Sequence, residues 1–146
     1  MQDEVDRFFE QLDRDAIVAA IKEAEDKGRG EIRVHLQRGR VKDAMGEASR
    51  VFKELGMEKT EQRSGCLIFI APEEKAFAVV GDLGIHEKVG DAFWLNARDA
   101  AAEHFSQGRF TDGVVAAVRV IGEALARYFP REAVNPNELP DDVSVN

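Results

Sequence analysis

The order of apolar and glycine-marked segments predicts an α/β fold, a three-layer α/β/α sandwich around a small mixed β-sheet. The observations behind this class are a strand–helix–strand pattern, a tight connection to a third strand, and two long helical patterns after it. Residues 66–71 are apolar at every position, so we expect a central strand that helices cover on both faces. The length of 146 residues suits one domain.

Two amphipathic helices are expected before the sheet. Residues 5–12 carry apolar side chains at helical spacing within an otherwise acidic segment. Residues 14–27 repeat apolar side chains three and four positions apart, with Asp13 suited to cap the helix and Gly28 to end it. Each helix therefore has one apolar face to bury against the rest of the protein.

A change of period separates the first strand from the next helix. Residues 31–37 alternate between apolar and polar side chains, which predicts a strand with one apolar face. From Val41 to Leu55 the apolar residues recur at helical spacing, and the buried stripe that we expect there includes Met45. Gly56 is expected to end this helix.

The second and third strands form a predicted hairpin. Residues 66–71 and 76–80 are joined by a short turn, which makes them antiparallel. The helix between the first two strands makes those two parallel, with a right-handed β-α-β crossover. Two long helices are then expected, over residues 87–105 and from a cap at Thr111 to Phe129.

These elements divide the chain into three parts. Residues 1–12 are expected to be a helical extension, and residues 13–130 the α/β domain. Residues 131–146 contain two prolines and four acidic residues, and we expect an extended tail that is at most partly docked.

Composition excludes several classes of function. The net charge of −8 disfavours binding to the phosphate backbone of nucleic acids. Cys66 is the single cysteine, so an intramolecular disulfide and a cysteine-based metal cluster are both excluded. The acidic N-terminus does not resemble a secretory signal, and the longest apolar run is far too short to span a membrane. We therefore expect a cytoplasmic protein without an integral membrane segment.

The predicted strand directions bring several chemically capable residues to one rim of the sheet. The starts of the first two strands meet the end of the third, so Glu31 and Arg63 should lie near Asp82, with His86 and Glu87 close behind. Asp82, Glu87 and Glu31 could ligate a hard cation through carboxylate oxygens. His86 could be a further ligand or a proton-transfer group, and Arg63 could bind an anion such as phosphate.

Each of these residues also has an ordinary structural interpretation. Asp82 would serve the turn and Glu87 would favour the start of a helix. His86 would be a loop residue or the partner of a helix cap, and Glu31 would be solvated at a strand end. Arg63 would pair with one of the acidic residues at the rim. The sequence leaves both sets of interpretations open.

At this point the sequence resembles the TPM domain, a family that includes thylakoid-lumen photosystem-repair proteins and many small bacterial proteins. The resemblance is carried by four short segments in fixed order, residues 30–34, 63–71, 79–86 and 104–113. It implies an α/β/α sandwich and a divalent-metal site in the loops at one rim, and acid phosphatase activity is attributed to plant members. Many members carry an acidic residue where this chain has Arg63, and the glycine-rich segment after the third strand differs at His86.

Three functions follow as hypotheses. The first is a divalent-cation-binding module with a regulatory or protein-interaction role, in which Ca²⁺ or Mg²⁺ comes before Zn²⁺ as the expected ion and the partner is a protein. The second is a metal-assisted acid phosphatase, for which the sequence shows no complete catalytic set. The third is a metal-free adaptor or assembly factor that uses the segment around Phe8 and Phe9, or the acidic tail, as its contact surface.

Overall fold

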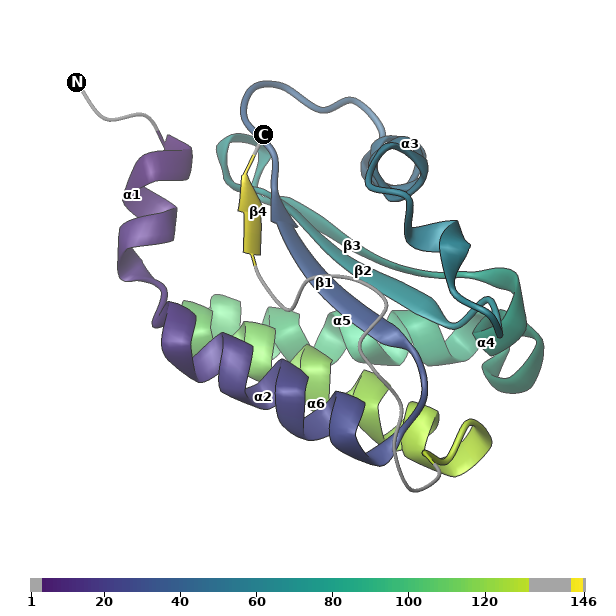
Figure 1. The fold of residues 1–146 in the computed structure, drawn as a ribbon. Helices are drawn as coiled ribbons and strands as arrows, with labels where there is room; N and C mark the ends of the chain where they lie inside the picture. Colours follow the sequence, from purple (N-terminus) through teal and green to yellow (C-terminus); the bar gives the residue numbers. More distant parts are fainter. Residues whose placement is uncertain (1–3, 132–142, 146) are drawn as a thin grey trace.

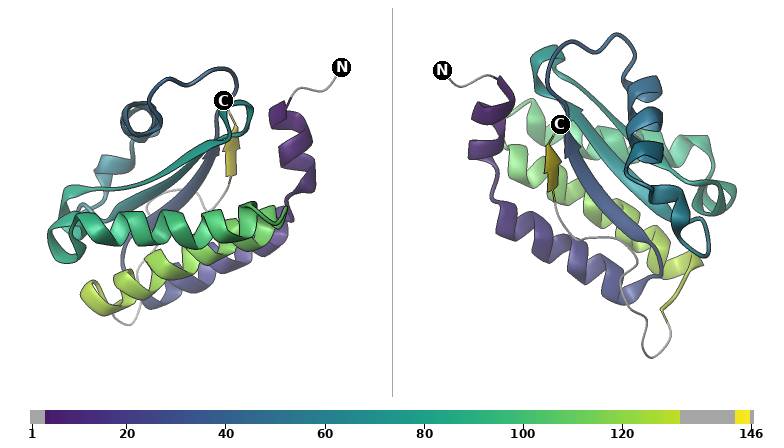
Figure 2. Two further views of the ribbon diagram at one scale, coloured as in Figure 1. Left: turned by 180° about the vertical axis from the view of Figure 1, so that it is seen from behind. Right: turned by 45° about the horizontal axis from the view of Figure 1, so that its top comes forward.

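A computed structural model describes residues 4–131 and 143–145 of the chain (Figure 1). Four strands form one mixed sheet in the order β3-β2-β1-β4. Their bounds are Glu31–Leu36 for β1, Gly65–Ala71 for β2, Ala76–Gly81 for β3 and Val143–Val145 for β4. The sheet lies between helices on both faces, which confirms the predicted three-layer α/β/α sandwich (Figures 1 and 2).

Six α-helices surround the sheet in the described part of the chain. Helices α2, α5 and α6 cover one face, and α3 covers the other (Figure 2). Their bounds are Glu4–Gln11 for α1, Arg14–Lys27 for α2, Ala44–Glu54 for α3, Leu83–Val89 for α4, Asp91–Phe105 for α5 and Phe110–Tyr128 for α6, with short 3-10 turns at Met57–Lys59 and Pro72–Glu74. Among the described residues, no helix has the length and apolar character needed to cross a bilayer.

Strand β2 is the centre of the fold. All seven of its residues are buried, as the unbroken apolar run predicted. β1 pairs with it in parallel and β3 in antiparallel orientation, which confirms the β-α-β unit and the hairpin. Ile68 and Ile70 belong to the core on the side of α2, α5 and α6, whereas Leu67 and Phe69 belong to the core under α3. The alternation of side chains along one strand thus supplies both cores.

The helical elements follow the predicted pattern with changes in their bounds, and α3 begins at Ala44 instead of Val41. Helix α2 has the predicted bounds, and the Asp13 carboxylate accepts a hydrogen bond from the Ala16 N–H at 3.0 Å. The helix expected over residues 87–105 is instead two helices, α4 and α5, which meet at Gly90. Gly90 has a φ of +77°, in the region that favours glycine, and this backbone conformation ends α4 before α5 begins.

Two side chains have roles that differ from the predicted ones. Met45, expected in the buried stripe of α3, is 52% exposed because it lies in the first turn of α3, beside the free edge of β3. Thr111, expected to cap α6, lies inside that helix, which begins at Phe110. Its hydroxyl oxygen accepts a hydrogen bond from the Asp13 N–H at 2.9 Å and so joins the starts of α2 and α6.

The acidic tail contains a strand that the sequence analysis did not predict. Residues 143–145 form β4, which pairs in parallel with β1 opposite β2, while residues 132–142 lie outside the described part. In this arrangement the Ser144 hydroxyl lies 2.5 Å from Nδ1 of His35. His35 is buried, and burial together with the nearby charges of Arg33 and Arg50 lowers its pKa, although a hydrogen bond with Gln37 opposes the shift.

The lowered pKa of His35 makes stability depend on pH. The unfolded chain binds this proton more readily than the folded chain, so stability is lost as the pH falls from about 6.5 towards the folded pKa. We expect His35→Gln to lose less stability than wild type between pH 7 and pH 5.5, as measured by urea unfolding at each pH. Identical pH dependence in the two proteins would contradict this assignment.

Helices α2 and α6 approach closely at Gly122. A Cβ atom at Gly122 would lie 2.7 Å from the Cβ of Ala24, whereas a Cβ at Gly46 on α3 would meet only the flexible Asp43 side chain. Overpacking should outweigh the gain in helix propensity, so we expect Gly122→Ala to cost about 1–2 kcal/mol of unfolding free energy.

The matched control for this prediction is Gly46→Ala, which should be neutral or stabilising by up to about 1 kcal/mol. Urea denaturation of both variants measures the difference. Equal effects of the two substitutions would show that α2 and α6 do not meet at this position.

Candidate functional site

The sheet register gathers the predicted rim at one end of the molecule. Glu31, the first residue of β1, pairs with Gly65, the first residue of β2. The Gly65 carbonyl accepts a hydrogen bond from the Asp82 N–H at 2.9 Å, directly after the end of β3. Glu31 and Asp82, which are 51 positions apart in the sequence, therefore lie at the same end of the sheet.

Asp82 and Arg63 form a bidentate ion pair at this rim. The Arg63 Nε donates to Oδ2 of Asp82 at 2.6 Å, and Nη2 donates to Oδ1 at 2.8 Å. Oδ1 also accepts from the Leu83 N–H at 2.8 Å, so the same carboxylate caps α4. The Asp82 side chain is 5% exposed and that of Arg63 is 44% exposed. The hydrogen bonds to Asp82 raise the pKa of the Arg63 guanidinium above its ordinary value, which keeps this cation charged.

The backbone around Arg63 holds the loop before β2 against the start of α4. Arg63 has a φ of +51°, and its carbonyl accepts hydrogen bonds from the N–H groups of Gly84 and Ile85 at 2.8 and 3.3 Å. A Cβ at Gly84 would lie 1.9 Å from the Gln62 carbonyl oxygen, so only glycine permits this approach. Backbone contacts and the ion pair therefore fix the same junction.

The remaining predicted site residues do not complete a cluster around Asp82. Glu31 is 2% exposed, so the solvated position expected for a strand end is wrong. The Nδ1 atom of His86 accepts a hydrogen bond from the Trp94 Nε1–H at 2.9 Å, and its Nε2 lies 3.4 Å from the Asp91 carboxylate. Glu87 is exposed on α4 and makes no ion pair with a described residue.

The described residues at the rim do not fit a divalent cation. Nowhere in residues 4–131 and 143–145 do three histidine, cysteine or acidic side chains gather in a way that could hold a metal ion. Both Asp82 oxygens already accept hydrogen bonds, and the Arg63 guanidinium supplies the positive charge that a metal would bring to this carboxylate. The predicted structural role of Asp82 and the predicted pairing of Arg63 with an acid are both observed.

Two further polar side chains near the rim are structural. Cys66 is fully buried, and burial raises the pKa of its thiol, so the nucleophilic thiolate is disfavoured. Ser64 is also buried, and its N–H donates to the hydroxyl of buried Thr60 at 3.0 Å. Neither residue is placed for nucleophilic catalysis.

A groove beside the rim follows the free edge of β3, and we call it the β3 groove. It has a volume of about 630 Å³, and residues 77–81 of β3 line it. The start of α3 forms one wall and helices α4 and α5 form the other. These walls are contributed by Asp43, Ala44, Met45, Leu83, His86, Asp91, Trp94, Leu95 and Arg98. The sequence analysis did not predict this groove.

The missed residues carry only a weak signal in the sequence. Leu83 and Leu95 are 61% and 52% exposed; Leu83 lies between Asp82 and Gly84, and Leu95 lies between Trp94 and Asn96. An isolated apolar residue on a surface is common, so it does not mark a binding site. Only the fold brings these two leucines and Met45 to one groove.

Comparison with known proteins identifies the family. The sequence profile described as the TPM domain matches residues 3–124. The chain belongs to the TPM-domain family. Among solved structures, it is similar to the BA42 protein of the psychrophilic bacterium Bizionia argentinensis, determined by NMR, with 41% sequence identity and a TM-score of 0.84. That similarity covers 91% of this chain and 92% of BA42. No curated protein matches the chain.

The position of Arg63 in this TPM domain leads to a test with cations. We expect Ca²⁺ to shift the amide NMR signals of residues 63–65 and 82–86 only weakly in wild type. Arg63→Gln removes the guanidinium from Asp82 and should therefore increase these shifts. A strong wild-type response that Asp82→Asn abolishes and Arg63→Gln leaves unchanged would contradict the assignment of Arg63 as the resident cation.

Proposed function

We propose that this TPM domain is a protein-interaction module whose β3 groove receives an extended segment of a partner protein. The observation that carries the proposal is the position of β3. Among the described residues, β3 is an edge strand paired only with β2, and five of its six residues line the groove. The unpaired edge of a strand offers backbone donors and acceptors to an added strand.

The side chains around the groove suit an alternating partner segment. Four large apolar side chains are strongly exposed in the described part of the chain, and Met45, Leu83 and Leu95 around the β3 groove are three of them. Successive residues of an added strand would point alternately towards α3, which carries Met45, and towards α5, which carries Leu95. Apolar residues of the partner would therefore be buried on both sides of the added strand.

Charge favours a basic partner segment. Asp43 and Asp91 lie at the walls of the groove, and both are exposed. Arg98 is a cation on the wall, but it lies 3.2 Å from the Asp99 carboxylate, which offsets its charge. The whole chain has a net charge of −8. A segment with lysine or arginine beside its apolar residues would be complementary in charge.

Cation binding and phosphatase activity are alternative proposals that rest on the family resemblance. A cation at the rim would have to displace Arg63 from Asp82, and no catalytic residue is assigned. An adaptor role through α1 or the tail is a third proposal, and Phe8 is 9% exposed, which leaves little of that side chain for a partner. A cytoplasmic location is also a proposal, supported by the presence of a single cysteine.

A defined peptide tests the proposed function. We expect an eight-residue peptide of four consecutive valines with two lysines at each end to shift the amide NMR signals of residues 77–81 and to slow their hydrogen exchange. The same peptide with N-methylated backbone amides on alternate residues should bind much more weakly, because it lacks the donors that an added strand needs. Shifts confined to other surfaces, or equal binding of the methylated peptide, would contradict the proposal.

Matched variants on α5 locate the binding surface. Leu95→Lys replaces an apolar side chain of the groove wall by a positive charge, which opposes the lysines of the peptide, and should weaken peptide binding at least about tenfold, a loss of about 1.4 kcal/mol. Asn96→Lys adds the same charge at the next, exposed position outside the groove and should have little effect. Equal losses in the two variants would indicate non-specific electrostatic binding.

A further inference from the structure

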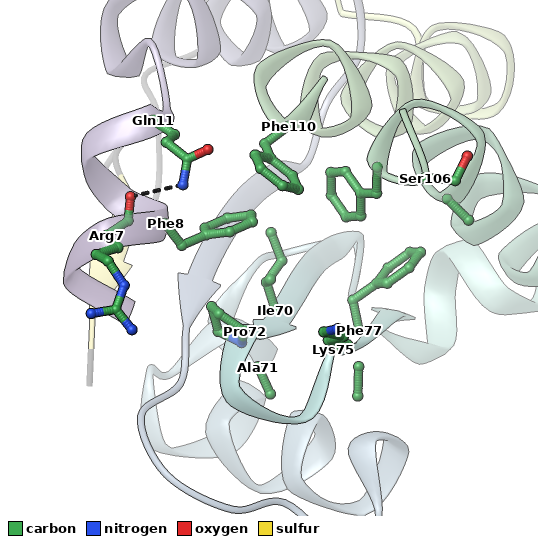
Figure 3. A pocket seen from close by; sticks show the side chains of 13 residues that line it. Arg7, Phe8, Gln11, Ile70, Ala71, Pro72, Lys75, Phe77, Ser106 and Phe110 are labelled. Carbon is green, nitrogen blue, oxygen red and sulfur yellow. Dashed lines mark hydrogen bonds between the residues drawn. The ribbon is translucent and has the colours of Figure 1, made fainter. Parts of the chain in front are cut away.

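A second cavity lies at the end of the sheet opposite the rim, between α1 and the turn that joins β2 to β3 (Figure 3). Its volume of about 550 Å³ is in the range of pockets that hold small molecules. Figure 3 shows Phe8 of α1, Phe77 of β3 and Phe110 of α6 around the same space. We call this cavity the phenylalanine pocket.

Aromatic contacts build the apolar wall of the phenylalanine pocket. The ring of Phe8 lies 4.8 Å from that of Phe110 and 6.3 Å from that of Phe105, centroid to centroid. The ring of Phe77 lies 5.1 Å from that of Phe105. Three helices and one strand thus supply four connected rings, and Ile70 and Ala102 add aliphatic surface. An apolar group inside this pocket would be removed from water.

The charged side chains among the described residues that line the pocket are both cationic. Within the described part of the chain, this lining contains Arg7 and Lys75 and no carboxylate. The chain as a whole has 28 acidic and 20 basic residues. Both cationic side chains are exposed, and Lys75 makes no ion pair with a described residue. The pocket therefore combines an apolar interior with a cationic opening.

We propose that the phenylalanine pocket binds a small monocarboxylate with an apolar tail, such as a medium-chain fatty acid. The tail would lie among Phe8, Phe77 and Phe105, and the carboxylate would lie near Lys75 and Arg7. The charge complementarity at the opening selects an anionic head group over a neutral or cationic one. This site shares Phe77 with the lining of the β3 groove, but the proposal does not depend on the proposed function.

Calorimetric titration with octanoate, at concentrations where it remains monomeric, tests this proposal with matched variants. Ala102 lines the pocket and Ala92 is exposed elsewhere on α5. We expect Ala102→Leu to fill the space and weaken octanoate binding at least about tenfold, whereas Ala92→Leu makes the same change outside the pocket and should stay within about twofold of wild type.

A surface variant tests the head group without altering the packing of the pocket. Lys75→Gln should weaken the binding of octanoate and leave the weaker binding of 1-octanol unchanged, because the alcohol carries no charge. The proposal is overturned if wild type does not bind octanoate, if Ala102→Leu binds it as wild type does, or if octanol binds as tightly as octanoate. It is also overturned if octanoate changes the oligomeric state instead of filling the pocket, as judged by light scattering.

Discussion

The rest of the structure depends on the ion pair between Arg63 and Asp82, because it connects two parts of the fold. Arg63 lies in the loop before the central strand, and Asp82 lies between β3 and α4 and caps α4. Asp82 is almost fully buried, and a buried carboxylate is costly unless its charge is balanced and its oxygens accept hydrogen bonds. The Arg63 guanidinium meets both needs through two parallel bonds. The charge of the Asp82 carboxylate is therefore balanced by the protein itself.

Helix α4, which Asp82 caps, links the ion pair to the β3 groove. His86 on α4 accepts the hydrogen bond from Trp94, and the indole of Trp94 lies so close to Gly81 that a Cβ there would clash with it. The wall of the groove is thus set by the end of β3 and the start of α4 together. The phenylalanine pocket lies at the opposite end of the sheet, where α1 closes over the hairpin. Phe77 lines both surfaces, and each can be altered by itself at the other described residues of its lining.

Most of the fold could be predicted because local patterns and global packing agree. The unbroken apolar run of β2 and the helical spacing of the apolar residues in α2 are both strong patterns, and strand direction alone brought Glu31 and Asp82 to one rim. Strand β4 could not be predicted, since three residues after a proline-containing segment do not show where they pair. The pairing of Arg63 was one of two open alternatives, because spacing does not reveal which acid lies within reach of a guanidinium.

A double-mutant cycle on Arg63 and Asp82 tests most directly whether the arginine serves as the resident cation of the rim. Arg63→Gln, Asp82→Asn and the double variant would be compared by urea unfolding at neutral pH, with no divalent cation present. If the pair neutralises the buried carboxylate, the double variant loses clearly less stability than the sum of the two single losses. Additive losses would mean that the two side chains do not stabilise one another, and the rim would then need another source of positive charge.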